Sequence, residues 1–237
     1  MSRGPGAFAP DPAPHMPEGR VVKPDMSPPT TFVLLRHGET ALTPEKRFSG
    51  SGRGADPELS DRGRGQADRA ARALKAHTPP VDLIVTSPLA RCRQTAEAAA
   101  GLLGLDVSVD DDLRETDFGA WEGLTFKDVR ERHPDDLNAW LASPSWAPTG
   151  GGESFDTVTA RVAAARERLA ASHRGRTLLL VSHVTPIKTL LRLALGAPPE
   201  ALYRMELSAA SLSTVACYAD GNATVRCLND TSHLRQI

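Results

Sequence analysis

Three short apolar runs constrain the fold of this chain more than any other feature of its sequence. They are FVLL at 32–35, VDLIVTS at 81–87 and TLLLVSH at 177–183. A continuous apolar run of this length, bounded by polar residues, is typical of a strand that is buried on both faces. We therefore expect these runs to form strands inside a parallel sheet.

Helical patterns follow or separate these runs. The second and third runs lead into apolar-periodic segments at 87–103 and 185–195, and a further amphipathic segment at 60–77 begins at Ser60, its expected N-cap. Strands that alternate with helices in this way predict a sheet that is covered on both faces. The expected fold class is therefore α/β, with a mainly parallel central sheet.

The remaining segments have a different character. The first thirty residues hold eight of the nineteen prolines, so we expect residues 1–30 to be a disordered tail or linker and residues 31–237 to form one domain. Near the C-terminus, two β-rich runs within 212–228 surround an Asp-Gly pair, which predicts a hairpin. Residues 130–152, with prolines, two tryptophans and a triple glycine, are expected to form an irregular loop or lid near the site.

Composition argues against several classes of protein. Hydrophobic residues make up 40% and charged residues 24% of the chain, as in a typical globular domain. The formal net charge of −1 provides no field that would gather nucleic acid or an anionic membrane, so we expect neither partner. The sequence has no apolar run of membrane-spanning length, and Cys92, Cys217 and Cys227 lack the spacing of a zinc site. We expect reduced thiols and a cytoplasmic protein.

Charged residues stand directly after the three apolar runs. Arg36 and His37 follow the first run, Arg91 follows the second, and His183 closes the third. Because parallel sheets bind ligands beyond the carboxyl ends of their strands, we expect these four side chains to converge. Two guanidinium groups, which match phosphate oxygens two at a time, favour a dianion such as phosphate. The sequence therefore predicts a phosphate pocket.

These residues also suggest a reaction. We expect the neutral imidazole of His37 to attack phosphorus and form a phosphohistidine, with His183 donating a hydrogen bond to the transferring group. The leaving oxygen then needs a proton from a carboxyl group, which could later activate water. By chemistry alone, the acid could be Glu115 or any of five carboxylates close to it in the chain, which are Asp110, Asp111, Asp112, Asp117 and Glu122. This scheme needs no metal and no other cofactor.

Five blocks of the chain resemble one protein family. LLRHGET, SPLARCRQTA, LRETDFGAWEG, GGESF and VSHVTP are similar, in order and spacing, to the histidine phosphatase superfamily, which includes the cofactor-dependent phosphoglycerate mutases and many acid phosphatases. The resemblance covers about residues 31–228. It implies a three-layer α/β/α sandwich and phosphohistidine chemistry. It places five residues at the family's catalytic positions, which are Arg36, His37, Arg91, Glu115 and His183.

Three further residues are expected to bind substrate. Thr43 stands where many members of the family have asparagine, and its hydroxyl can still donate a hydrogen bond. Val184 stands where glycine is usual after the second histidine, and it can still offer its backbone N–H. Ser49 matches a position in the substrate loop that carries a small hydroxyl or amide group.

Hydrolysis is the expected activity, and two alternatives stay open. Mutases of the family carry a basic block after the acid, whereas Thr116, Asp117 and Phe118 follow Glu115 here and supply no cation. A catalytically silent module that binds phosphorylated ligands is the second alternative. The sequence lacks the GxSxG elbow of serine hydrolases, the HExxH motif of zinc proteases and the phosphate-cradling loop of nucleotide hydrolases.

The resemblance is strongest to α-ribazole phosphatase and acid phosphatase members, including the phosphatase half of actinobacterial ribonuclease H–acid phosphatase fusions. We expect a small phosphomonoester as substrate, and a homodimer is left open as the assembly. Aromatic residues are expected either to wall a site for a base-like leaving group or to pack in the core. They are Phe48, Trp121, Phe126, Trp140 and Trp146.

Overall fold

The computed structural model describes residues 27–51 and 56–235, so most of the expected N-terminal tail lies outside the described residues. The strands in these ranges are β1 (Thr30–Arg36), β2 (Leu83–Thr86), β3 (Val107–Val109), β4 (Thr177–Ser182), β5 (Leu212–Cys217) and β6 (Ala223–Asp230). The α-helices are α1 (Asp61–Lys75), α2 (Ala90–Leu103), α3 (Phe126–Arg132), α4 (Pro134–Ala142), α5 (Phe155–Ser172) and α6 (Val184–Ala194). None of the helices in these ranges has the length and apolar character that crossing a membrane requires.

The strands form one mixed sheet that is mainly parallel, as expected. Its order is β3-β2-β4-β1-β5-β6, and the three predicted apolar strands β2, β4 and β1 lie side by side at its centre. These strands and β3 run parallel, whereas β5 is antiparallel to both β1 and β6. The predicted C-terminal hairpin is confirmed, with its turn at Ala219 and Asp220.

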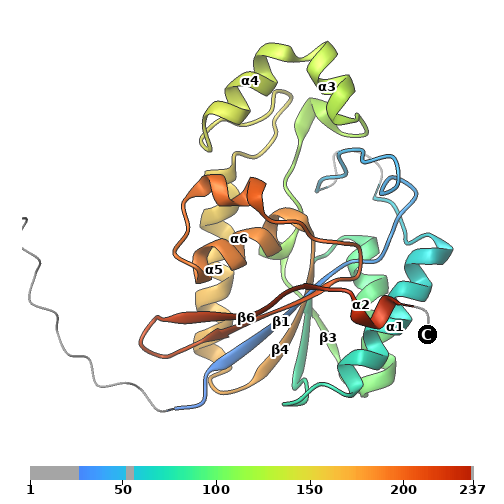
Figure 1. Ribbon diagram of the computed structural model, residues 1–237, viewed down its shortest axis with the longest axis vertical. Helices are drawn as coiled ribbons and strands as arrows, with labels where there is room; N and C mark the ends of the chain where they lie inside the picture. The colour runs from blue at the N-terminus through green and yellow to red at the C-terminus, as the bar shows by residue number, and fades with distance from the viewer. Residues whose placement is uncertain (1–26, 52–55, 236–237) are drawn as a thin grey trace, which may run out of the picture.

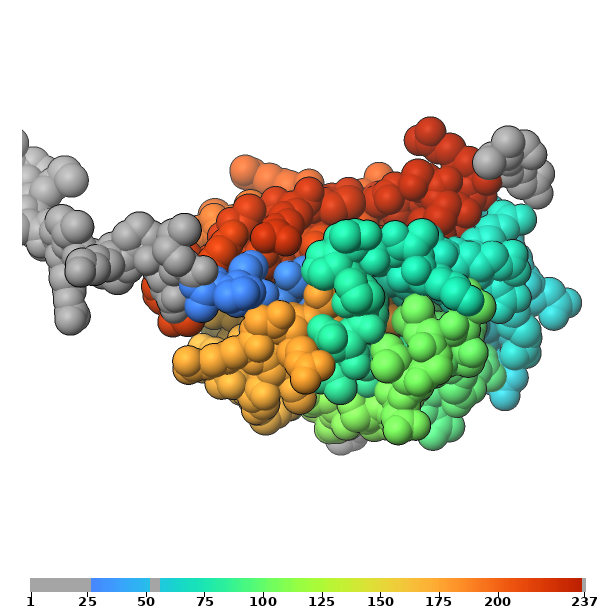
Figure 2. Space-filling model, turned by 90° about the horizontal axis from the view of Figure 1, so that it is seen from below, coloured from blue at the N-terminus to red at the C-terminus, as the bar shows by residue number. Residues whose placement is uncertain are grey.

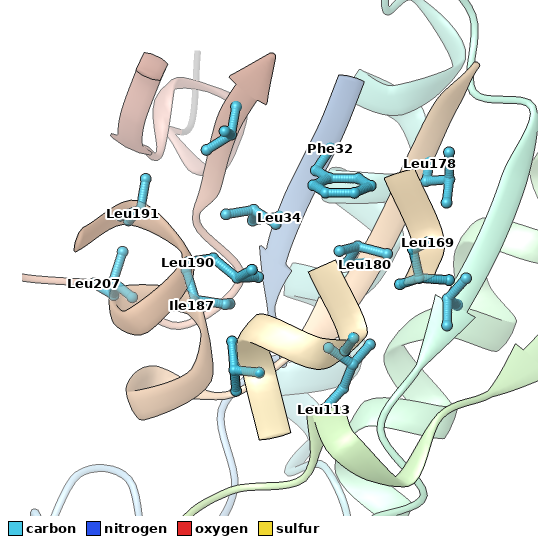
Figure 3. Packing of buried hydrophobic residues seen from close by; sticks show 14 of the residues in the cluster. Phe32, Leu34, Leu113, Leu169, Leu178, Leu180, Ile187, Leu190, Leu191 and Leu207 are labelled. Carbon is cyan, nitrogen blue, oxygen red and sulfur yellow. The ribbon is translucent and has the colours of Figure 1, made fainter. Parts of the chain in front are cut away.

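Alternating side chains of β1 point into two different layers of the core. Phe32 and Leu34 pack with α5 and α6 on one face of the sheet (Figure 3), whereas Val33 and Leu35 pack with α1 and α2 on the other. Figure 1 shows the sheet between these two pairs of helices. The expected three-layer sandwich is therefore confirmed, and its two covered faces explain why β1 is apolar at successive positions.

The segment 130–152 is more regular than expected. Helix α3 ends at Arg132 and α4 begins at Pro134, so the irregular part is confined to the residues after Ala142. Proline is tolerated at the first position of a helix because no intrahelical hydrogen bond is lost there. Leu137 and Trp140, three residues apart, supply the buried face. The prediction of an irregular loop was therefore wrong for α4.

Helices α3 and α4 lie beyond the carboxyl ends of the parallel strands (Figure 1). They contribute to a small separate core. Trp121 and Trp140 are buried in this core, and Phe48 packs against it. Phe126 and Trp146 are exposed over 39% and 44% of their surface. Core packing therefore accounts for the two buried tryptophans, and the five aromatic residues do not form one wall.

A buried carboxylate joins the parts of this small core. Asp136 accepts hydrogen bonds from the indole N–H groups of Trp121 (3.0 Å) and Trp146 (2.7 Å). It also accepts from the backbone N–H and the hydroxyl of Thr149, both at 2.9 Å. Burial raises the pKa of Asp136, but the hydrogen bonds to its charged form outweigh burial and lower this pKa overall. The charged carboxylate therefore stabilises the folded state.

Replacement of Asp136 by asparagine is expected to lower the free energy of unfolding by about 1–3 kcal/mol, because the amide turns one acceptor into a donor. The pKa in the folded state lies below the ordinary value of 3.8. The contribution is thus present above that value and is lost as the pH falls through the folded pKa. Urea titrations in neutral and acidic buffer measure both effects. Asp135→Asn, on the exposed side of the same helix, is the matched control, and equal losses for both variants would contradict this role.

A cavity of about 620 Å³ lies at the end of the sheet where β1 begins, which is the amino end of the parallel strands. Its lining includes Thr30, Arg174 and Tyr218, from the start of β1, the end of α5 and the hairpin. Figure 2 shows the start of β1 at this end of the molecule, between α5 and the C-terminal hairpin. The predicted site residues are not part of this lining, since they follow the opposite ends of the parallel strands.

Candidate active site

His37 stands at the carboxyl end of β1, and its backbone is held from both sides. Its N–H donates to the carbonyl of Ser182 at the end of β4 (3.0 Å), and its own carbonyl accepts from the N–H of Ala210 (3.1 Å). The next residue, Gly38, donates its N–H to the hydroxyl of Thr95 on α2 (3.1 Å). Contacts from three segments that are distant in the sequence therefore fix the position of this imidazole.

The loop after β1 lies against the N-terminus of α1. Ser60 caps this helix as predicted, and its hydroxyl accepts from the N–H of Gly63 (3.1 Å). A Cβ atom at Gly38 would lie 2.4 Å from the carbonyl oxygen of Gly63, and a Cβ at Gly63 would lie 2.0 Å from that of Glu39. The two glycines are therefore needed because the two backbones approach each other so closely.

The hydrogen bond of the His37 ring determines its tautomer. Nδ1 lies 2.7 Å from the carbonyl oxygen of Gly38, which can only accept, so Nδ1 carries the proton and Nε2 carries the lone pair. Burial lowers the pKa of His37 well below 6.5, and the charges of Arg91 and Arg36 lower it further. The structure therefore presents a neutral imidazole with a free lone pair, which is the form that a nucleophile requires.

Both predicted arginines are close to His37. Arg36 donates from one terminal nitrogen to the carbonyl of Leu207 (2.6 Å). Arg91, with only 1% of its surface exposed, donates to the carbonyls of Ser49 and Gly50, both at 3.0 Å. Its other terminal nitrogen lies 3.4 Å from the carboxylate of Asp56. These contacts orient the two guanidinium groups.

The Nε–H of each guanidinium group is unpaired. The Nε–H groups of Arg36 and Arg91 are buried and have no hydrogen-bond acceptor among residues 27–51 and 56–235. Buried donors normally find an acceptor, and a missing partner calls for an explanation. Oxygens of a bound phosphate would supply acceptors to both groups.

His183 follows β4 and lies beside His37, with 5.1 Å between the ring centroids. Its Nε2 lies 2.7 Å from the hydroxyl of Ser87 and 3.3 Å from the thiol sulfur of Cys92. Burial lowers the pKa of His183 well below 6.5, and so do Arg91 and His37. Burial also raises the pKa of Cys92, which keeps this thiol uncharged. An anion in the pocket would offset these effects and favour protonation of the ring.

The carboxylate of Glu115 is buried beside the start of α6. Its Oε1 accepts from the N–H of Thr116 (2.9 Å) and, more weakly, from that of Thr185 (3.3 Å), the second residue of α6. The negative charge of Glu115 also acts to raise the pKa of Arg36. The structure therefore brings together Arg36, His37, Arg91, Glu115 and His183 beyond the carboxyl ends of the parallel strands.

The other carboxylates near Glu115 are engaged elsewhere. Asp110 and Asp112 pair with Arg168, and Asp111 pairs with Arg114. Asp117 accepts from the N–H of Gly119. Glu122 accepts from the N–H groups of Gly50 and Phe118. Glu115 differs from these five carboxylates in that it accepts an N–H from α6, the helix that follows His183, and its role as the acid stays a prediction.

An arginine that the sequence analysis did not single out holds the loop of Glu115. Arg161 on α5 donates to the carbonyls of Asp112 (2.8 Å), Arg114 (2.7 Å) and Glu115 (3.2 Å). It also forms two hydrogen bonds with Glu153, each at 3.0 Å. Glu153 therefore forms an ion pair with this arginine. The sequence did contain a signal for this contact. Helical spacing places Arg161 one turn from buried residues of α5, and thus on the buried side of that helix.

The three expected substrate-binding residues differ in their surroundings. Ser49 lies in the loop that Arg91 holds, and its buried hydroxyl has no partner within the described ranges. Val184 is the first residue of α6, where a backbone N–H has no intrahelical acceptor. The hydroxyl of Thr43, in contrast, bonds to the N–H (3.0 Å) and hydroxyl (3.1 Å) of Thr40 within its own turn. Because the Thr43 hydroxyl accepts this N–H, its own O–H can be donated either to the Thr40 hydroxyl or to a ligand.

Comparison with known proteins agrees with this geometry. Residues 32–231 match the family model described as histidine phosphatase superfamily (branch 1). This chain belongs to that superfamily. In the part of the chain that the structure describes, no group of three or more histidines, cysteines and carboxylates could hold a metal ion.

Relatives in this superfamily include proteins of different length. A protein of Mycobacterium tuberculosis described as bifunctional is 50% identical over 206 residues, which cover 87% of this chain and 55% of that protein. This chain therefore spans about half the length of the first curated relatives that it matches. Phosphoserine phosphatase 1 of Hydrogenobacter thermophilus is 32% identical, with 86% of this chain and 93% of that protein covered.

Solved structures of the superfamily share the fold. A mycobacterial glucosyl-3-phosphoglycerate phosphatase, solved in complex with VO3, matches with a TM-score of 0.75 and 33% sequence identity. The match covers 85% of this chain and all of that one. The resemblance predicted from five sequence blocks is thus confirmed at the level of the family and of the fold.

Proposed function

We propose that this chain is a phosphatase that hydrolyses small phosphomonoesters through a phosphohistidine on His37. One observation carries the proposal: two arginines, the partly buried Arg36 and the buried Arg91, each with a buried and unpaired Nε–H, lie around a neutral imidazole. Fixed cations stabilise the charge on a transferring phosphoryl group, and a buried lone pair on nitrogen can attack phosphorus. A structural role for so many buried cationic donors would leave their orphaned N–H groups unexplained.

In the first step, Nε2 of His37 forms a bond to phosphorus while the bond from phosphorus to the leaving oxygen breaks. The carboxyl group of Glu115 gives its proton to that oxygen, so an alcohol leaves instead of an alkoxide. Arg36 and Arg91 bind the nonbridging oxygens throughout. His183, beside His37, donates a hydrogen bond to the same group.

In the second step, a water molecule attacks phosphorus and the nitrogen–phosphorus bond breaks. Glu115, now a carboxylate, takes a proton from this water, which restores its acid form. The electron pair of the broken bond returns to Nε2 of His37. Inorganic phosphate then leaves, and the pocket regains its starting charge.

The names of the relatives support a small substrate. Phosphoserine phosphatase and glucosyl-3-phosphoglycerate phosphatase are both named for the hydrolysis of small phosphomonoesters. Both match most of this chain, so we propose the same class of substrate here. α-Ribazole phosphatase, whose structure from Shigella flexneri matches with a TM-score of 0.74, belongs to this class too.

Rapid quench with phosphorus-labelled p-nitrophenyl phosphate tests the proposal. We expect an acid-labile label on the wild-type protein and inorganic phosphate as the final product. Transfer of the label to a phosphoglycerate, at a rate above that of phosphate release, would instead favour a mutase. Absence of both label and phosphate release would leave only a silent binding module.

The low pKa of His37 predicts activity in acidic solution. Protonation of Nε2 removes the lone pair, so kcat/KM should fall as the pH drops through the pKa of His37, which burial, Arg91 and Arg36 hold well below 6.5. Replacement of Arg91 by methionine should move this acid limb to higher pH. The pH profile with p-nitrophenyl phosphate, corrected for the ionisation of the ester, measures the limb. A wild-type limb at or above 6.5 would contradict the environment assigned to His37.

A further inference from the structure

A half-buried lysine on α6 has no partner that explains it. Lys188 makes neither a hydrogen bond nor an ion pair with any residue in the ranges 27–51 and 56–235. Burying part of an ammonium group without a partner costs free energy, and lysines at such positions are usually paired. The position of Lys188 is therefore a reason to look for a ligand.

Helix α6 places Lys188 on the side of the phosphate pocket. It lies one turn after Val184 and Thr185, which open the helix directly behind His183. Residues three and four apart share one face of a helix, and side chains lean toward the helix N-terminus. The N–H of Thr185 donates to the carboxylate of Glu115, so the start of this helix lies beside the acid, and the charge of Glu115 acts on Lys188.

The segment 206–207 borders the other side of this face. Leu207 packs in the same cluster as Ile187 and Leu190 of α6, as Figure 3 shows. The carbonyl of Leu207 accepts from Arg36 at 2.6 Å, which ties this segment to the phosphate pocket. Lys188 therefore stands on a helix that is held between Glu115 and the partner of Arg36.

Charged groups near Lys188 shift the pKa of its ammonium group. Burial lowers the pKa of Lys188, Glu115 raises it, Arg36 lowers it and Glu206 raises it. The two carboxylates favour the charged form of the lysine. A cation is thus available beside the acid, although the residues that directly follow Glu115 in the sequence supply none.

We propose that Lys188 binds a second anionic group, such as a carboxylate, on the leaving group of the substrate. The inference rests on the proposed function, in which Glu115 protonates the leaving oxygen. A cation beside Glu115 faces the leaving group rather than the phosphoryl group, which the two arginines hold. Lys188 is then a specificity residue, and the substrate class narrows to phosphomonoesters whose alcohol carries a negative charge close to the ester oxygen.

Matched inhibitors test this role without knowledge of the natural substrate. 3-Phosphonopropanoate and propylphosphonate have similar size and differ in one carboxylate, as do phosphonoacetate and ethylphosphonate. Their inhibition constants are measured against hydrolysis of p-nitrophenyl phosphate by the wild type. We expect at least one carboxylated inhibitor to bind about tenfold or more tightly than its partner, the effect typical of a hydrogen bond to a charged group.

Lys188→Gln should reduce this ratio of inhibition constants to about one. Lys75→Gln, at the exposed end of α1, makes the same change of charge far from the site and should keep the wild-type ratio. A wild-type ratio near one, or a ratio that survives in Lys188→Gln, would overturn the inference while leaving the phosphatase proposal intact. A wild type that releases no phosphate from p-nitrophenyl phosphate would instead overturn the proposed function itself.

Discussion

Replacement of His37 by asparagine is expected to stop the release of phosphate from p-nitrophenyl phosphate. The amide is similar in size to the imidazole, but it has no nitrogen lone pair that can attack phosphorus. We expect kcat to fall by roughly three orders of magnitude or more, as when an enzyme loses its nucleophile. The acid-labile label seen by rapid quench should disappear with it.

His173→Asn is the matched control for this variant. His173 caps the C-terminal end of α5, and its carbonyl accepts from the hydroxyl of Thr30 at the far edge of the sheet. The same substitution there should leave kcat close to that of the wild type. Thermal unfolding of both variants checks that the fold is kept. A labelled His37→Asn protein would show that another residue receives the phosphoryl group.

Replacement of Glu115 by glutamine is expected to slow poor leaving groups far more than good ones. The amide can accept the N–H groups of Thr116 and Thr185 through its oxygen, but it cannot give a proton to the leaving oxygen. p-Nitrophenolate leaves with little help, whereas an alkyl alkoxide needs the proton. We expect about a 10²–10⁴-fold loss of kcat/KM with alkyl phosphates, the usual range for general acid catalysis.

A plot of log kcat/KM against the pKa of the leaving group measures this effect, because the variant should give a steeper slope. Asp111→Asn is the control, since Asp111 is an exposed carboxylate in the same loop and the one hydrogen-bonding and ion-pair partner of its side chain in the described ranges is Arg114. Equal losses for all leaving groups would contradict proton donation and point to a role of Glu115 in shaping the pocket.

Local patterns were sufficient to predict most of the fold. A strand buried on both faces must be apolar at successive positions, and β1, β2 and β4 were predicted on that ground. Helix α1 begins at the predicted Ser60 cap because capping depends on neighbouring residues alone. The prediction failed at α4, where the prolines, tryptophans and triple glycine of 130–152 were interpreted as a sign of a loop. Short helices depend on packing partners, here the tryptophans joined by Asp136, which a local pattern does not reveal.

The order of strands and polar blocks along the chain by itself determined the fold class, the family and the four charged residues at the strand ends. This is because parallel strands must bring their carboxyl ends to one edge. Tertiary structure alone decided which of six carboxylates is buried beside the start of α6, the helix that follows His183, since hydrogen bonds from Thr185 and Arg161 hold Glu115 and its loop there. It alone also placed Lys188 next to that acid. Such contacts join residues far apart in the chain, and spacing along a sequence does not record distance in space.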